Sequence, residues 1–355
     1  MPAEWSVHQR TFLSWPIQAS MCYPEDYNRV CKEYYQRLVK AIAEFEPVSV
    51  IINPEENEGF EAIIQDKETS YPIDYLTIPH NDAWLRDNGP TFVINDQGKV
   101  AGINWDFNAW GGKYSPWDLD NEVAPKILDH YDIQRFDAPL VMEGGSIHTD
   151  GEGTILTTEE CLLNPNRNPS LSKGEIEHYL HSYLGSQQVI WLKRGLYGDE
   201  TDGHIDNIAC FAAPGKILLQ VCKDKDDPNY DISRENVQIL RDSVDAKGRR
   251  LEVFPVPQPP MRMFEGKRLT LSYINFYFVN KGIILPVFGG DADETDAEVI
   301  DILSQLYPDR SIIQIDGMTI IKEGGNVHCT TQQMPRKQRR GTVLLLHNEP
   351  KEPSP

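Results

Sequence analysis

The spacing of hydrophobic residues alternates between a helical period and a strand period along most of the chain. Near the N-terminus, apolar residues at helical spacing predict an amphipathic helix over residues 25–45, followed by a strand over residues 48–52. A further helical stretch is expected from Pro54, because proline suits the first turn of a helix.

A repeating order of elements follows. Strand segments begin near Asp74, Asp132, Gln188, Arg250 and Arg310, about 60 residues apart. Each strand leads into an apolar hairpin with turn residues at its tip. The expected hairpins cover residues 91–105, 146–158, 207–220 and 272–288, and a last one combines the segment around Val327 with a strand at 341–347.

Helical segments separate most of these units, and the expected ranges are 119–131, 172–184, 230–246 and 293–307. Ser172 with Glu175 is typical of a capping box. Five similar α/β units favour one closed repeat architecture over residues 1–348, with a loose tail at 349–355. The alternative is a doubly wound parallel sheet, but tight hairpins argue against it because parallel strands need crossovers.

Composition narrows the classes of function. With 40% apolar and 25% charged residues, the chain is neither disordered nor fibrous. A net charge of −20 disfavours nucleic acids and anionic membranes as partners. It would favour a cationic ligand if part of it lines a cleft, although solubility alone also explains an acidic surface.

Targeting signals and cysteine usage indicate the compartment. No apolar run approaches the roughly 20 residues of a transmembrane helix, and residues 1–16 lack the apolar stretch of a secretion signal. None of the six cysteines forms a C-x-x-C pair, so zinc-finger and thioredoxin-like sites are not expected. Six cysteines in a chain of this length make a poor disulfide framework, and the reducing cytoplasm is therefore expected.

Two local repeats place reactive residues in different units. The segment Glu143-Gly-Gly-Ser-Ile-His148 recurs as Glu323-Gly-Gly-Asn-Val-His328. Asp87-Asn88, with a phenylalanine five residues after the aspartate, resembles Asp206-Asn207. In a ring of repeated units, equivalent positions converge on the central axis. We therefore expect a site that collects one or two side chains from each unit.

Cys329 is the candidate nucleophile, because it follows two glycines that permit close approach to a ligand. A structural cysteine is the plain alternative for any single cysteine. We assign the other five cysteines to packing, since they lack polar neighbours in the sequence. His204 and Asp206, at i and i+2 on an extended chain, point to the same side and suit a general base beside a carboxylate. A solvated loop histidine is equally consistent with this motif.

Asp87 and Glu143 complete the candidate set, although each also suits a turn before glycine. A metal site is one explanation of the set, but the histidine and cysteine lack zinc-site spacing, and three carboxylates binding a hard metal need no cysteine. A guanidinium explains all five, because carboxylates bind its planar fork bidentately and leave the carbon open to a thiolate. Cys329 would attack that carbon, and His204 would protonate the departing nitrogen and then activate water. Glu143 would orient His204, while Asp87 and Asp206 would hold the guanidinium.

The chain resembles the agmatine deiminases, a branch of the guanidine-modifying superfamily that also contains bacterial-type peptidyl-arginine deiminases. The resemblance covers nearly the whole chain. It is carried by seven motifs in order: Met1-Pro-Ala-Glu-Trp5 with His8, Thr11 and Trp15-Pro16; Trp84-Leu-Arg-Asp-Asn-Gly-Pro90; Asn108-Ala-Trp-Gly-Gly-Lys113; Glu143 to His148; residues 157–169; Asp199-Glu-Thr-Asp-Gly-His-Ile-Asp206; and residues 324–333.

The resemblance implies a five-bladed α/β propeller of the pentein type, built from ββαβ-like units about a pseudo-fivefold axis. It implies a hydrolase of linear amidines that converts agmatine and water to N-carbamoylputrescine and ammonia, a step toward putrescine. The family's nucleophile, histidine and carboxylates match Cys329, His204, Asp87, Glu143 and Asp206. No metal and no organic cofactor are expected. The chain departs from the family at Glu323, where glycine is frequent, and this affects the shape of the pocket.

Agmatine has an amine in place of the carboxylate of arginine, and Glu200 is the residue expected to hold it. Trp84 and Trp110 would cover the aliphatic chain or stack on the guanidinium, and core packing is the alternative for Trp84. Arginine, peptidyl-arginine and non-catalytic binding of guanidines or polyamines remain open alternatives. The expected partner is a small cationic guanidine, and assembly into a homo-oligomer is left open.

Overall fold

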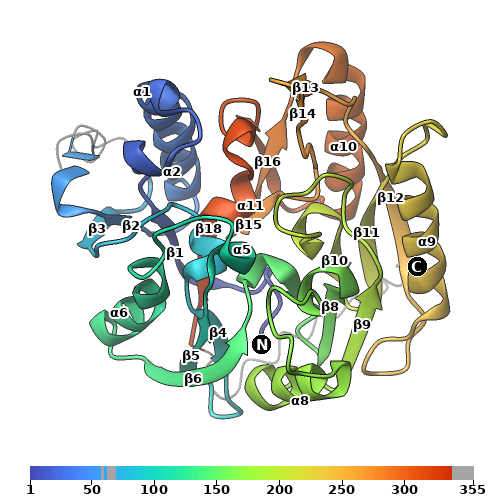
Figure 1. Ribbon diagram of the computed structural model, residues 1–355, viewed down its shortest axis with the longest axis horizontal. Coiled ribbons are helices and arrows are strands. Elements are labelled where there is room, and N and C mark those ends of the chain that lie inside the picture. Colours follow the sequence, from blue (N-terminus) through green and yellow to red (C-terminus); the bar gives the residue numbers. More distant parts are fainter. Residues whose placement is uncertain (57–59, 62–68, 338–355) are drawn as a thin grey trace, which may run out of the picture.

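The computed structural model describes residues 1–56, 60–61 and 69–337, and every element below lies in those ranges (Figure 1). Five small sheets share one strand order, in which an antiparallel pair is followed by a parallel strand. Four of these sheets follow one another along the chain. Their strands are β4 (Thr91–Ile94), β5 (Val100–Asp106) and β6 (Gln134–Val141); β7 (Ile147–Thr149), β8 (Thr154–Thr158) and β9 (Gln188–Leu192); β10 (Ala209–Ala213), β11 (Lys216–Val221) and β12 (Glu252–Pro257); and β15 (Tyr277–Val279), β16 (Gly282–Val287) and β17 (Ser311–Asp316).

A helix carries the chain from the hairpin of each sheet to its parallel strand. These helices are α6 (Val123–His130), α8 (Lys173–Leu184), α9 (Asn229–Asp242) and α10 (Asp293–Leu306), and they lie outside the sheets in Figure 1. The four hairpins expected at residues 91–105, 146–158, 207–220 and 272–288 are therefore confirmed, and so are the four helices. A plain doubly wound parallel sheet is excluded, because each sheet contains an antiparallel pair.

The fifth sheet joins the two ends of the described chain. Its order is β18 (Thr331–Pro335), β1 (His8–Ser14), β2 (Val48–Ile52) and β3 (Ile73–Thr77), with β18 antiparallel to β1. The hairpin expected around Val327 is wrong, because Val327 begins the short helix α11 (Val327–Thr330), which Asn326 caps through its side-chain oxygen. The strand expected at residues 341–347 and the tail at 349–355 lie outside the described residues.

Local sequence explains several elements of this scaffold. The helix expected at residues 25–45 is present as α1 (Tyr27–Arg29), a π-helical segment (Val30–Tyr35) and α2 (Gln36–Ala43). Leu38 and Ile42 of α2 lie one turn apart and are fully buried. The helix expected from Pro54 begins as a 3₁₀ turn (Pro54–Glu56), and most of its remaining length lies outside the described residues.

Two details show how closely helices and sheets are fitted. The capping box of α8 is confirmed, since the backbone N–H of Ser172 donates to Oε2 of Glu175 at 2.8 Å and the Ser172 hydroxyl caps the helix in return. A Cβ added at Gly102 of β5 would lie 2.3 Å from Cδ2 of Leu128, so α6 packs directly on the backbone of its sheet.

Four short turns lie where neighbouring units meet. They are α4 (Leu85–Asn88), η6 (Gly144–Ser146), η7 (Ile205–Asn207) and α11, and they contact one another in sequence around the centre of the molecule: α11 with α4, α4 with η6, and η6 with η7. The sheets thus act as a scaffold that brings chain segments far apart in sequence to one place.

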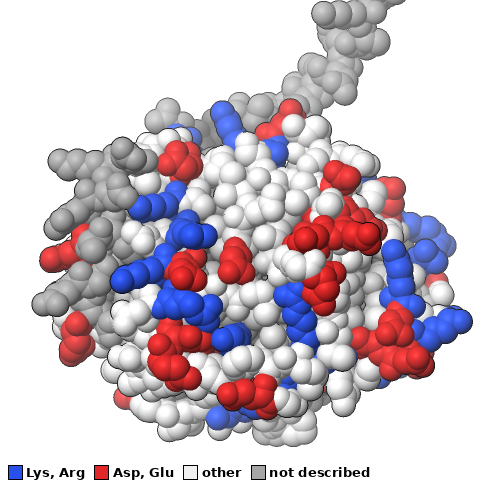
Figure 2. All heavy atoms as spheres, turned by 90° about the horizontal axis from the view of Figure 1, so that it is seen from above, with Lys and Arg blue, Asp and Glu red and all other residues white. Residues whose placement is uncertain are grey.

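The surface is mixed in charge. On the face shown in Figure 2, acidic and basic side chains are interspersed, and the basic ones form no continuous patch among the described residues. Within the same ranges, every helix is too short or too polar to cross a membrane. A small ribbon, β13 (Met263–Phe264) and β14 (Lys267–Arg268), stands apart from the five sheets.

Candidate active site

The four central turns carry all five residues expected to form the site. Asp87 lies in α4, Glu143 precedes η6, His204 precedes η7, Asp206 lies within η7, and Cys329 lies in α11. All five side chains are at least 95% buried. Residues spread from position 87 to position 329 therefore meet in one cluster, as the sequence predicts.

Gly145 marks the point where three of these side chains converge. A Cβ added there would lie 2.7 Å from Nδ1 of His204, 2.8 Å from Oδ1 of Asp87 and 2.9 Å from Oδ2 of Asp206. Only a residue without a side chain leaves room for this approach. The glycine of the Glu-Gly-Gly segment is thus required by the packing of the cluster around it.

The Cys329 thiol faces one carboxylate and one amide. Its Sγ lies 3.6 Å from Oδ2 of Asp206 and 3.1 Å from Nδ2 of Asn275, which donates to it. Burial, followed by the negative charges of Asp206 and Asp87, raises the pKa of the Cys329 thiol well above its ordinary value. The sulfur with these neighbours is therefore protonated at neutral pH.

His204 lies between two carboxylates. Its Nδ1 is 3.8 Å from Oδ1 of Asp87, and its Nε2 is 3.6 Å from Oε2 of Glu143. Burial by itself would lower the pKa of His204, but the charge of Asp87 and the contacts with Cys161 and Glu143 raise it well above its ordinary value. Neither ring nitrogen has a hydrogen-bond partner within the described part of the chain, so a protonated ring has N–H groups available for a ligand.

Glu143 is held from behind by a buried arginine. Nε of Arg167 donates to Oε1 of Glu143 at 2.6 Å, and its NH1 donates to Oδ2 of Asp202 at 2.8 Å. Burial would raise the pKa of Glu143, but the contacts with His204 and the charge of Arg167 lower it below its ordinary value. The carboxylate is therefore ionised and fixed beside the His204 ring.

Cys161 corrects one expectation from the sequence. We expected it to serve only packing, without polar neighbours, yet its Sγ lies 3.9 Å from Oε2 of Glu143 and also contacts His204. One ligand atom each from Glu143, Cys161 and His204 lie within 4.8 Å of one another, a spacing that could hold a metal ion. However, the guanidinium of Arg167 already binds this carboxylate, and its charge opposes a cation there.

The two aspartates differ in their hydrogen-bond partners and in the direction of their pKa shifts. Asp87 accepts from Nε1 of Trp110 and from the backbone N–H of Gly145, both at 2.9 Å, while burial raises its pKa to about 6 against the opposing effect of His204. Asp206 accepts through Oδ2 from Nδ1 of His328 at 2.8 Å, whereas its buried Oδ1 has no partner among the described residues. Burial would raise the pKa of Asp206, but His328 lowers it, so this carboxylate is ionised.

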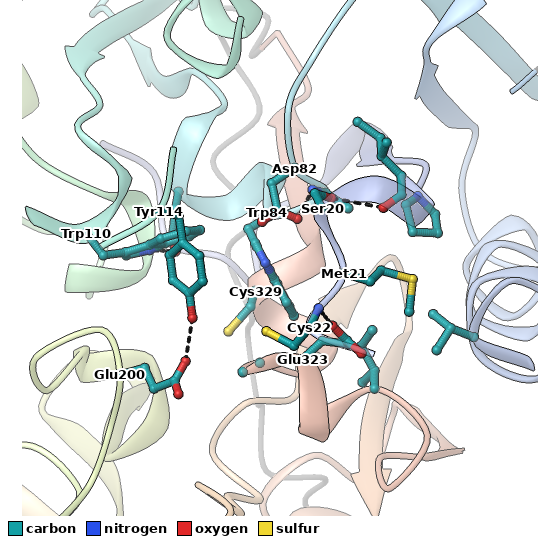
Figure 3. Close-up of a pocket in the computed structure, with 18 of the residues that line it drawn as sticks. Ser20, Met21, Cys22, Asp82, Trp84, Trp110, Tyr114, Glu200, Glu323 and Cys329 are labelled. Atoms are coloured by element: carbon teal, nitrogen blue, oxygen red, sulfur yellow. Dashed lines mark hydrogen bonds between the residues drawn. The ribbon is translucent and has the colours of Figure 1, made fainter. Parts of the chain in front are cut away.

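A pocket of about 700 Å³ leads from the surface to this cluster (Figure 3). Its walls include Cys329, Asp87 and the three residues expected to bind substrate, Trp84, Trp110 and Glu200. Trp84 and Trp110 are 8% and 6% exposed and therefore face the pocket with only part of each ring. Hydrophobic residues also line one side of the pocket, namely Pro16, Ile17, Met21, Val30 and Ile320.

Acidic residues surround the outer part of the pocket. Oε2 of Glu200 accepts from the hydroxyl of Tyr114 at 2.7 Å, as Figure 3 shows. Glu323 accepts from the backbone N–H groups of Cys22 and Tyr23 at 2.6 and 3.2 Å, so it is a wall residue held in place. Burial and the charges of Asp120 and Glu323 raise the pKa of Asp82, on the opposite wall, to about 8.

The sequence did not reveal every residue of this site. Asn275 lies between two strands without any motif, and the contact between Cys161 and Glu143 exists only in space. A weak signal was available for Arg167, which lies in the Asn-Pro-Asn-Arg-Asn-Pro segment and is buried although its neighbours are at least partly exposed. Cys22, expected only to pack, lines the pocket together with Asp82 and Tyr114.

Comparisons with known proteins agree with this geometry. Residues 1–335 match the Porphyromonas-type peptidyl-arginine deiminase family. The chain is 43% identical over 365 residues to an agmatine deiminase from Pseudomonas aeruginosa, with 96% of each chain covered. It is also similar to the structure of an agmatine deiminase from Enterococcus faecalis, with a TM-score of 0.86, 35% identity and 95% and 96% of the two chains covered.

A second solved structure, an agmatine deiminase of C. jejuni with substrate bound, gives a TM-score of 0.84 at 30% identity, with 96% of each chain covered. These similarities extend over nearly the full length of each protein and therefore include all five sheets as well as the four central turns. The chain belongs to the Porphyromonas-type peptidyl-arginine deiminase family.

Proposed function

We propose that this protein is an agmatine deiminase, which hydrolyses agmatine to N-carbamoylputrescine and ammonia. The observation that carries the proposal is the cluster of one thiol, one imidazole and three carboxylates at the base of a pocket whose outer part is also acidic. A planar cation fits this arrangement, because Asp87 and Asp206 each place a carboxylate oxygen within 2.9 Å of one point beside Gly145 and can hold a cation together. The agmatine deiminases among its relatives support the same substrate.

The two aspartates would hold the guanidinium. Asp206 offers its unpartnered Oδ1 while His328 fixes its other oxygen. Asp87 is fixed by Trp110 and by the backbone of Gly145. Two charge-assisted contacts from fixed carboxylates orient the cation, and orientation can supply several kcal/mol of the rate enhancement that a poor electrophile needs, on the order of 7–11 for the best intramolecular cases.

Binding of the cation would activate the nucleophile. The pKa of Cys329 is raised by burial and by the charges of Asp206 and Asp87. The positive charge of a guanidinium bound between those carboxylates offsets both negative charges and therefore lowers the pKa of the thiol. The thiol proton then leaves to solvent, and the thiolate forms a bond to the guanidinium carbon. Protonated His204 gives its proton to the departing nitrogen, the carbon–nitrogen bond breaks, and ammonia and an S-alkyl thiouronium result.

Neutral His204 would then remove a proton from water as the water oxygen bonds to the same carbon. Collapse of this adduct breaks the carbon–sulfur bond, restores the thiolate and protonated His204, and gives the protonated ureido product, whose excess proton passes to ammonia. Glu143, held by Arg167, stabilises the His204 cation in both steps. Each step uses only side chains already within the cluster.

The far end of the pocket supports agmatine over arginine. Glu200 lies at the outer part of the pocket with its carboxylate fixed by Tyr114, and Glu323 adds a second acidic group to the wall, whereas Asp82, with its pKa raised to about 8, is neutral at pH 7. An ammonium is attracted by this environment and a carboxylate is repelled. Trp84 and Trp110 would line the path of the aliphatic chain between the two charged ends.

We infer further that the five sheets are the blades of a five-bladed α/β propeller of the pentein type. The common strand order of the sheets and the pairing of β18 with β1 support this interpretation. We also propose that residues 1–348 form one catalytic domain, because the fifth sheet takes strands from both ends of the described chain.

Product analysis with agmatine, free arginine and an arginyl peptide offered in parallel tests the proposal. We expect ammonia and the ureido product from agmatine, with little from the other two. In Cys329→Ser, turnover should fall by at least 1,000-fold, since an alcohol is a far weaker nucleophile at neutral pH. Full turnover by that variant would exclude the mechanism, and ammonia from arginine but not agmatine would overturn the substrate.

A further inference from the structure

The two Glu-Gly-Gly segments that recur in the sequence end in histidines that meet at a single carboxylate. His328 Nε2 lies 2.7 Å from Oε1 of Glu4, and His148 Nε2 lies 3.5 Å from Oε2 of the same residue. Glu4 is 4% exposed and belongs to a segment far from both histidines in sequence. The repeat therefore places one ring beside each oxygen of a carboxylate that the reaction described above does not use.

His328 connects this carboxylate to the site. Its Nδ1 bonds Oδ2 of Asp206 at 2.8 Å, and the same oxygen lies 3.6 Å from Sγ of Cys329. A ring with a carboxylate oxygen on each nitrogen is satisfied in full only when both nitrogens carry protons. Glu4, His328, Asp206 and Cys329 thus form one continuous buried row of interacting groups.

The surroundings show that Glu4 sets the charge of this ring. Burial opposes an imidazolium at His328, and so does the charge of Arg86. The Nη1 of Arg86 lies 3.4 Å from Oε1 of Glu4, and its Nε donates to the backbone oxygen of His328. Glu4 and Asp206 favour the imidazolium, and together they raise the pKa of His328 above its ordinary value. Asn275 accepts from the backbone N–H of His328 and adds no charge.

His148 has a different role at the same carboxylate. Its Nδ1 accepts from the backbone N–H of Phe211 at 3.2 Å, so the ring needs only one proton, on Nε2, to contact Glu4. It therefore orients Glu4 without requiring a positive charge. Glu4 is left with its charge directed toward His328 and Arg86.

We propose that Glu4 is a positioning residue for Asp206, acting through the His328 ring. The carboxylate keeps His328 in the doubly protonated form, and that imidazolium fixes Oδ2 of Asp206 and leaves Oδ1 to receive the guanidinium. This inference rests on the proposed function for its kinetic consequence, but the charge state of His328 is a property of the protein alone.

Glu4→Gln removes the charge and keeps the shape and a hydrogen-bonding group. A neutral His328 can then donate through Nδ1 to Asp206 and accept at Nε2 from the new amide, so a purely structural role of Glu4 would leave catalysis nearly unchanged. If the charge matters, the pKa of His328 falls, and whatever depends on its imidazolium is lost as pH rises through the lower value. The activity loss should therefore grow toward alkaline pH.

The experiment measures both properties in the full-length protein. NMR of protein with isotopically labelled imidazoles gives the pKa of His328, whose signal is identified among the nine histidines by its absence in His328→Asn. We expect Glu4→Gln to lower this pKa by at least one unit and to move the alkaline limb of kcat/KM for agmatine to lower pH. At the pH where the wild type is still fully active, kcat/KM should fall about tenfold.

Glu46→Gln is the matched control, because Glu46 is also fully buried and contacts a histidine, His8, at 2.9 Å, but does not contact Asp206 or His328. It should leave the pKa of His328 and the pH profile as in the wild type. An unchanged His328 pKa and alkaline limb in Glu4→Gln would overturn the proposal. A singly protonated His328 at pH 7 in the wild type would also overturn the proposal, and this measurement is possible even if the variant does not fold. If the wild type does not act on agmatine, the proposed function is overturned, but the NMR measurement of the His328 pKa still tests the role of Glu4.

Discussion

Adding one methyl group at Gly145 should disable the site while leaving the fold in place. In Gly145→Ala, the new Cβ would lie 2.7–2.9 Å from His204, Asp87 and Asp206, whereas ordinary contacts begin at 3.4 Å. To restore an ordinary contact of 3.4 Å, Nδ1 of His204 would have to move from 2.7 Å, a displacement of about 0.7 Å. The backbone conformation permits alanine at this position, because the φ angle of Gly145 does not lie in the left-handed region.

The expected loss of activity follows from that displacement. Misplacement of a reacting group by about 1 Å can cost about 100-fold in rate, and here three groups move at once. We therefore expect kcat/KM for agmatine to fall about 100-fold, which corresponds to ~2.7 kcal/mol. Overpacking of this kind should also lower the free energy of unfolding by about 1–3 kcal/mol.

The assay combines ammonia release with thermal unfolding followed by circular dichroism. Gly174→Ala is the matched control, because a Cβ at Gly174, in the first turn of α8, meets nothing within 4 Å. It should keep wild-type kcat/KM and unfold at the same or a slightly higher temperature. A folded Gly145→Ala protein with kcat/KM within threefold of the wild type would refute the convergence of the three side chains on this point.

Three further outcomes are expected. Asp87 must be ionised to hold the cation, and its pKa is raised to about 6, so kcat/KM should fall as the pH drops through 6. A pH profile that stays flat down to pH 4.5 would contradict this role of Asp87. Glu200→Gln should raise KM for agmatine about threefold and leave KM for an alkylguanidine without the amine unchanged, because its partly exposed carboxylate acts only on the far charge. Equal effects on both substrates would exclude that assignment. Ser172→Ala removes the cap of α8 and should lower the free energy of unfolding by about 1 kcal/mol without changing kcat, as denaturant titration would show.

The sequence predicted those elements that contain an apolar run bounded by turn residues or a helical period of apolar residues. Most strands of the four internal hairpins are continuous buried runs, and the helices that follow them repeat apolar residues at helical spacing, so both were located within a few residues. Strand β1 was not predicted, because it buries Thr11 and Ser14 alongside its apolar residues. Strand β18 was not predicted for the same reason, since it buries Gln332 and Gln333. Hydrogen bonds to distant segments satisfy such polar groups, and a local pattern does not contain that information.

The candidate site was predictable to the extent that reactive residues carry recognisable neighbours. Glycines beside Glu143 and Cys329 gave that signal. Asn275 and Cys161 carried none, because an amide or a buried thiol becomes informative only once its partner in space is known. The second Glu-Gly-Gly segment was noticed for its resemblance to the first, yet its acid, Glu323, binds backbone N–H groups at the pocket wall, and its histidine is the part that reaches the site.

The pairing of β18 with β1 has a consequence for the order of events during synthesis. Cys329 lies two residues before β18, so the C-terminal side of the helix that presents the sulfur is held only when β18 meets a strand made more than 300 residues earlier. A nascent chain with four sheets already formed would still hold Cys329 outside its final setting. Such long-range closure is slow compared with local folding, so enzymatic competence should be the last property that a ribosome-released molecule acquires.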